Sequence, residues 1–130
     1  MPIEEELLGI AVKELLPMLR STVETQLDSY NLVQREVDGR ALNFYCIKDG
    51  RVKHDDIPPL PLKSGEVKLL SVTFDITGQA ENMHMTACAV NGYFFCLAFS
   101  NDLRPYKDYR QIMVKEVHQS WRSNIDSTKK

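Results

Sequence analysis

The most reactive-looking cluster in the chain is the consecutive triplet His54, Asp55 and Asp56. An imidazole beside two carboxylates can bind a hard cation or act as a general acid and base. Adjacent side chains of an extended chain point in opposite directions, so the triplet alone cannot surround one atom. We therefore interpret it as a solvated charged loop that is available for contact with a partner.

A second candidate is the segment from Asp102 to Tyr106, with the sequence DLRPY. An arginine beside proline and tyrosine at the end of a strand can bind a carboxylate or anchor a partner protein. The alternative is that Arg104 orders the junction by pairing with the acidic start of the chain. The predicted partner-binding residues are His54, Asp55, Asp56, Pro59, Asp102, Arg104 and Tyr106.

Other chemistry finds no support in the sequence. It has no GxSxG elbow, no GxxxxGK[ST] loop and no GxGxxG loop. Cys46, Cys88 and Cys96 have no CxxC or Cys/His ligand spacing, which favours buried, reduced thiols. His84 is expected in the core. We predict no catalytic residue, no metal site and no cofactor.

The central structural feature is the segment Met83–Phe99, in which two apolar runs flank Asn91-Gly92. This pair favours a type I′ turn and therefore a β-hairpin. Regular pairing from that turn places Cys88 opposite Phe95 and puts Cys96 on the other face. Both faces are largely apolar, which predicts a central pair of strands covered on both sides.

Helical spacing of apolar residues predicts an N-terminal helix that Pro17 kinks or breaks. The segment 51–65 is rich in proline and predicts a surface strap in which Ile57, Leu60 and Leu62 pack on the core. The remaining predictions are strands over 30–37, 41–48 and 66–76, a turn at Asp38-Gly39, and a final helix over 108–123. The fold class is thus α+β: an antiparallel sheet of about five strands flanked by an N-terminal and a C-terminal helix.

The chain has 130 residues, 43% of them hydrophobic, and a net charge of −2. These values predict one domain over 1–130, with a frayed tail at 126–130, and argue against disorder and against nucleic-acid binding. There is no apolar run long enough to span a membrane and no basic n-region at the acidic N-terminus, so we expect a cytoplasmic protein.

The segment Tyr93–Pro105 (YFFCLAFSNDLRP) resembles the last strand and tail of SUKH-superfamily domains. These are small α+β domains, many of which are bacterial immunity proteins that neutralise partner toxins. The resemblance covers about the last third of the chain. It implies a bacterial protein with a protein partner and no enzymatic activity.

The function expected from the sequence is a non-catalytic cytosolic protein-binding domain, of bacterial immunity or chaperone type. The alternative is a small-molecule-binding protein or cryptic enzyme. Its pocket would lie between a curved sheet and the helices and be reached by His84, Tyr45 or His54. A homodimer formed through the hairpin at 30–48 is a third possibility.

Overall fold

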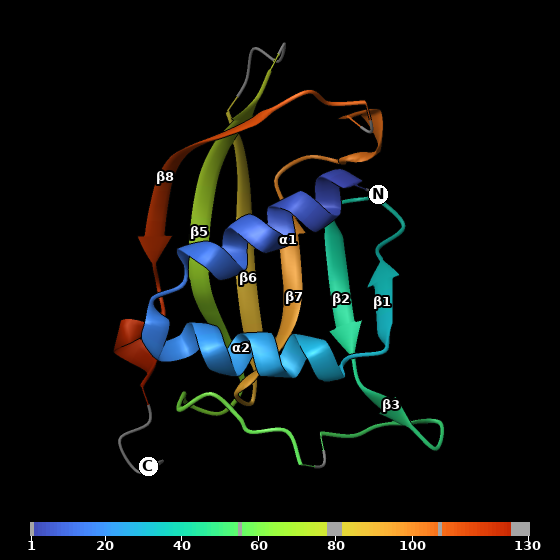
Figure 1. Cartoon of the computed structure of the whole chain (residues 1–130), viewed down its shortest axis with the longest axis vertical. Coiled ribbons are helices and arrows are strands. Elements are labelled where there is room, and N and C mark those ends of the chain that lie inside the picture. The colour runs from blue at the N-terminus through green and yellow to red at the C-terminus, as the bar shows by residue number, and fades with distance from the viewer. Residues whose placement is uncertain (1, 55, 78–81, 107, 126–130) are drawn as a thin grey trace.

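The computed structural model describes residues 2–54, 56–77, 82–106 and 108–125. Two helices cross one face of a six-stranded antiparallel sheet with strand order β1-β2-β7-β6-β5-β8 (Figure 1). The predicted α+β class is therefore confirmed. The elements are α1 (Pro2–Glu14), α2 (Pro17–Ser29), β1 (Leu32–Arg35), β2 (Ala41–Tyr45), β3 (Ile47–Lys48), β4 (Arg51–Val52), β5 (Glu66–Ile76), β6 (Met83–Val90), β7 (Tyr93–Phe99), η1 (Arg104–Tyr106), β8 (Ile112–Gln119) and η2 (Arg122–Asn124).

The two helices form one layer because their buried side chains recur every fourth residue. Pro17 separates the two helices. It occupies the first turn of α2, where the N–H that proline lacks would have no partner within the helix. The Arg20 guanidinium donates to the carbonyls of Lys13 and Leu15, so it satisfies the exposed end of α1. The fully buried stripe is Ile3, Leu7, Ala11, Leu15, Leu19 and Val23.

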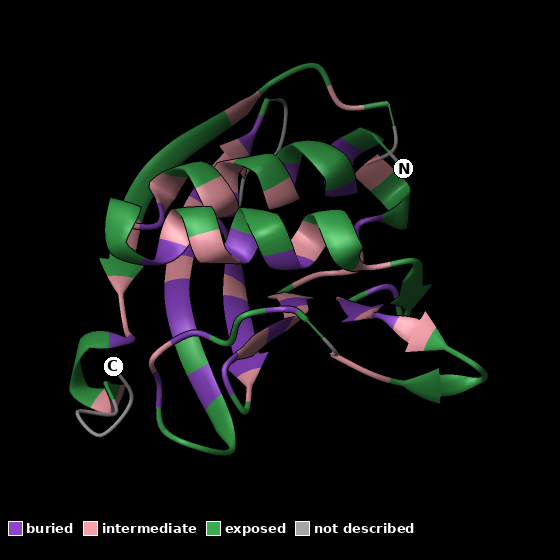
Figure 2. Cartoon of the chain, turned by 60° about the horizontal axis from the view of Figure 1, so that its bottom comes forward, coloured by how far each residue is buried: buried purple, intermediate pink, exposed green. Residues whose placement is uncertain are grey.

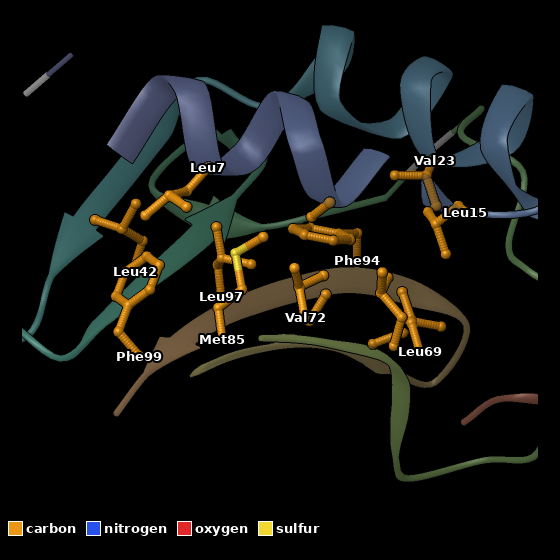
Figure 3. Packing of buried hydrophobic residues seen from close by; sticks show 14 of the residues in the cluster. Leu7, Leu15, Val23, Leu42, Leu69, Val72, Met85, Phe94, Leu97 and Phe99 are labelled. Carbon is orange, nitrogen blue, oxygen red and sulfur yellow. The ribbon is translucent and has the colours of Figure 1, made fainter. Parts of the chain in front are cut away.

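This stripe packs on the sheet and fills the space between the two layers (Figure 3). Leu42 of β2, Phe94 and Leu97 of β7, and Val72 of β5 supply the facing side chains. We call this the covered face of the sheet and its reverse the open face. None of the described helices is long and apolar enough to cross a membrane.

The first hairpin has the predicted register. Val33 pairs with Phe44 and Arg35 pairs with Leu42, as expected from a turn centred on Asp38-Gly39. Gly39 adopts φ +71° and its N–H donates to the Glu36 carbonyl over 2.9 Å, whereas Asp38 does not have the positive φ that a two-residue type I′ turn needs. β1 is an edge strand, so this hairpin lies at the margin of the sheet.

The central hairpin has the predicted turn but a different register beyond it. Val90 pairs with Tyr93, and Asn91 and Gly92 both have positive φ. A β-bulge then inserts Phe95 as an extra residue, so that Cys88 pairs with Cys96. The prediction that these two cysteines lie on opposite faces was wrong, because one inserted residue reverses the phase of the strand.

The prediction that this hairpin is covered on both faces was also wrong. Both helices lie on the same face (Figure 1). On the open face Thr86 and Ala98 are half-buried and His84 is exposed rather than a core residue. The His84 imidazole makes a 3.0 Å hydrogen bond with the Thr73 hydroxyl.

The predicted C-terminal helix is instead the strand β8. A second bulge explains the error, because it makes Lys115 the extra residue opposite Thr73 and Phe74 of β5. Ile112 and Val117, two apolar residues of the predicted helix, consequently lie on the same face, opposite Ile76 and Val72, although they are five residues apart. A regular strand would place them on opposite faces, so the sequence lacks the alternation that indicates a strand. Gln119 continues that face and donates to the Glu14 carbonyl at the end of α1.

The proline strap packs as predicted, with Ile57, Leu60 and Leu62 buried. Gln26 of α2 joins it to the central hairpin. Its buried amide donates to the Pro58 and Gly92 carbonyls, each over 2.9 Å, and accepts a 2.8 Å hydrogen bond from the Phe94 N–H.

Replacement of Gln26 by Ala should lower the free energy of unfolding by about 2–4 kcal/mol, because it leaves the Phe94 N–H and the Pro58 carbonyl without this partner. Urea denaturation followed by circular dichroism measures the change. Gln34→Ala on the exposed strand β1 is the matched control and should cost much less. Equal losses in the two variants would contradict the assigned role of Gln26.

An ion pair joins α1 to the edge of the sheet. The Arg35 guanidinium donates to both carboxylate oxygens of Glu4, over 2.7 and 2.8 Å. Burial alone would raise the pKa of Glu4, but hydrogen bonds and positive charge, those of Arg35 first among them, together outweigh it and hold that pKa below its ordinary value of 4.5.

A carboxylate with a depressed pKa stabilises the fold above its unfolded-state pKa, and this contribution disappears as the pH falls through the folded-state pKa. Glu4→Gln should therefore be less stable than the wild type at pH 7, and the difference should shrink below about pH 4.5. Urea titrations at several pH values measure it, with Glu24→Gln on the exposed side of α2 as the control. A difference that persists unchanged into acid would contradict the ion-pair explanation.

Candidate binding cavity

A cavity of about 400 Å³ lies where strands β2 and β7 stop pairing. The ladder between them ends at Asn43 and Cys96, although β2 continues to Tyr45 and β7 begins at Tyr93. The bulge at Phe95 falls at this point, so the two strands separate instead of closing the sheet. The residues that line the cavity are Phe44, Tyr45, Val52, His54, Val90, Asn91, Tyr93, Phe94 and Phe95.

Aromatic contacts hold the walls of this cavity. The Tyr45 and Phe95 rings meet edge to face with centroids 5.5 Å apart. The His54 ring stacks on Tyr93 at 3.9 Å with an interplanar angle of 7°. Such contacts add stability beyond area burial and leave few rotamers open, so the walls are preorganised.

Hydrogen bonds fix the rings from outside the cavity. The Tyr93 hydroxyl donates to the Ile57 carbonyl of the strap, over 3.1 Å. The Tyr30 hydroxyl donates to the Phe94 carbonyl over 2.6 Å, and burial raises the pKa of Tyr30. Burial lowers the pKa of His54, which favours the neutral imidazole. The walls therefore present uncharged, largely apolar surface.

The mouth of the cavity continues into exposed apolar surface. Val52 lines the cavity and is 53% exposed, on the β3–β4 hairpin that projects from the main sheet (Figure 2). Leu32 of β1 pairs with Tyr45 and is 45% exposed. Exposed apolar surface thus adjoins the cavity at Val52 and beside Tyr45.

Of the predicted site residues that the structure describes, His54 alone lines this cavity. Asp55 lies outside the described residues, and Asp56 is exposed with φ +65°. Pro59 is exposed and lies against the turn at Gly92, where an added Cβ would come within 3.0 Å of it.

Asp102, Arg104 and Tyr106 lie at the opposite end of β7 (Figure 1). Arg104 donates to both carboxylate oxygens of Asp102, over 2.8 to 3.1 Å, and both pack against Gly39. This pairing raises the pKa of Arg104 and lowers that of Asp102. Arg104 therefore orders its own loop beside the first hairpin through these bonds to Asp102.

The rest of the cavity was missed because its aromatic residues were assigned to the core. Side chains fill much of the space between the sheet and the helices (Figure 3), but a pocket of about 380 Å³ remains between α1 and strands β1 and β2, lined by Glu4, Glu5, Leu8, Val33, Arg35, Leu42 and Phe44. Tyr45 and His54, which were expected to reach such a pocket, instead line the cavity at the end of the sheet. His84 does not line it. The only available signal was the number of aromatic residues beside Asn91-Gly92, since a bulge leaves no clear pattern in the sequence.

Among the described residues, no group of three His, Cys, Asp or Glu side chains could hold a metal ion.

Two thiols lie together on the open face, where Cys88 pairs with Cys96. Burial, together with the Glu66 carboxylate, raises the pKa of the Cys88 thiol to about 12 and raises that of Cys96. The thiolate is the reactive form, so both groups should react slowly.

Iodoacetamide should modify Cys88 far more slowly in the folded protein than in urea, and Glu66→Gln should increase the folded-state rate several-fold, because a nearby carboxylate opposes thiolate formation. Mass spectrometry of the peptides gives the rate at each cysteine, with Glu24→Gln as the charge control. A rate that does not respond to Glu66→Gln would assign the low reactivity to burial alone.

Comparison with protein-family models, with curated proteins and with solved structures finds no significant match to this chain.

Proposed function

We propose that the protein is a partner-binding domain and that its aromatic cavity receives a large apolar side chain of a partner protein. One observation carries this proposal: the cavity opens directly onto exposed apolar side chains. A single buried anchor in a pocket, surrounded by a rim that excludes water, is the typical arrangement of a protein–protein hot spot. Cytoplasmic protein binding was also the function favoured by the sequence, and the SUKH resemblance implies the same kind of function.

The shape of the site supports a protein rather than a free metabolite as the occupant. A small molecule held in the cavity would leave Val52 and Leu32 facing water. A polypeptide can insert one side chain and cover both residues with its neighbours. The neutral walls favour an uncharged anchor, because burying a charge without a partner is costly.

A small planar ligand is the second candidate, and the stacked pair His54–Tyr93 favours it. The cavity volume lies within the range of about 300–1,000 Å³ that is usual for ligand pockets. A heteroaromatic ring could extend the stack that these two rings begin.

Peptides selected from a random library on the wild-type protein should carry an aromatic or large aliphatic residue. Val90→Trp fills the cavity and should weaken their binding at least tenfold in fluorescence anisotropy, because the anchor is excluded. Val37→Trp is the matched control, since Val37 is almost fully exposed and does not line the cavity. It should leave affinity unchanged.

Peptides that bind Val90→Trp as tightly as the wild type would overturn the proposed anchor site. Binding of indole to the wild type but not to Val90→Trp, with no peptide selected, would replace the protein partner by a small planar ligand.

A further inference from the structure

The outer edge of β8 is the longest strand edge that the described structure leaves unpaired. β8 has eight residues and pairs only with β5, whereas β1 at the other margin of the sheet has four (Figure 1). A free edge presents a row of backbone N–H and C=O groups that can pair with another strand. Two of its apolar side chains are exposed, Met113 by 49% and Val114 by 40%.

The bulge in β8 determines which side chains share a face. Lys115 and Glu116 are adjacent, so in a regular strand they would point to opposite faces. Here Glu116 pairs with Thr73, and the Lys115 ammonium lies 3.4 Å from the Asp75 carboxylate, which places both on the open face. Val114 and Val117 lie on the covered face, opposite Phe74 and Val72.

This arrangement makes β8 complementary to itself. In an antiparallel pair of β8 strands centred between positions 115 and 116, Lys115 lies opposite Glu116 of the second copy, and Val114 lies opposite Val117. Residues that lie opposite each other in antiparallel strands point to the same face. Because of the bulge, Lys115 and Glu116 share one face and Val114 and Val117 share the other, so both pairs meet this requirement. In a strand without the bulge, the two members of each pair would point to opposite faces.

The outer pairs agree with the same register. Met113 lies opposite His118 of the second copy, and both belong to the open face. Ile112 lies opposite Gln119, and both belong to the covered face, where they pair with Ile76 and Leu70 of β5.

We propose that a second copy of this chain pairs antiparallel with β8, in the register Lys115–Glu116, and joins the two sheets into one. The two-fold axis stands perpendicular to the joined sheet, so the helices of both copies lie on the same side. Each Lys115 then lies between its own Asp75 and Glu116 of the other copy. The pairing places exposed Met113 and Val114 within the joined sheet.

Lysine residues and bulges at sheet edges usually prevent such pairing. A lysine repels the lysine of a second copy when the two meet, but in this register each Lys115 meets a glutamate. The register thus turns two protective features into determinants of specificity.

Sedimentation equilibrium over a range of protein concentrations tests this proposal. The wild type should approach twice the monomer mass at the highest concentrations. Lys115→Glu and Glu116→Lys should each weaken the dimer about tenfold, because each places like charges opposite each other at two symmetry-related pairs. Lys68→Glu reverses an exposed charge on β5, away from this edge, and is the control; it should leave the dimer intact.

Two combinations identify the register. The double variant Lys115→Glu/Glu116→Lys restores opposite charges and should recover the wild-type association. A mixture of the two single variants should form a heterodimer more tightly than either variant pairs with itself. Glu116→Lys leaves the Lys115–Asp75 pair intact, so it remains informative if Lys115→Glu unfolds.

A wild type that stays monomeric at every concentration would overturn the proposal, as would a dimer that neither charge reversal weakens. The test is independent of the aromatic cavity, because Val90→Trp lies on β6 and should not alter the mass.

Discussion

The burial of one face of the sheet beneath α1 and α2 is the interaction on which the rest of the structure depends. A stripe that recurs every fourth residue, from Ile3 to Val23, requires a continuous apolar surface to pack against. Each strand must therefore direct its apolar residues to the same side. Where the sequence of a strand departs from strict alternation, a bulge restores the phase at the cost of one unpaired residue.

Two of these bulges generate the features with functional potential. The insertion of Phe95 ends the pairing of β7 with β2, and the aromatic cavity lies in the resulting gap. The insertion at Lys115 places two opposite charges on one face of an edge strand. The bulges that allow the strands to pack on the core thus also form the aromatic cavity and the charge pattern of the β8 edge. The proposed partner site and the proposed self-pairing lie at different margins of the sheet, so one molecule could use both at once.

Much of the fold could be predicted from local patterns. Pro17, Asp38-Gly39 and Asn91-Gly92 act through their own backbone preferences, and each ended or turned the chain as expected. The C-terminal strand could not be predicted, because the bulge at Lys115 interrupts the alternation of apolar residues that indicates a strand. Of the site, His54 was singled out from its residue type, whereas its stacking on Tyr93 depends on a strap that is distant in sequence.

The sequence by itself determined the turns, the helix break, the α+β class and the apolar residues of the strap that the core would bury. Those features depend on backbone preferences and on hydrophobic burial, which act at short range or through composition. Only the tertiary structure decided which face each strand presents, that Cys88 meets Cys96, and that aromatic residues of three segments surround a cavity. The reason is that one inserted residue reverses every side chain beyond it, and the position of that insertion is set by packing against distant parts of the chain.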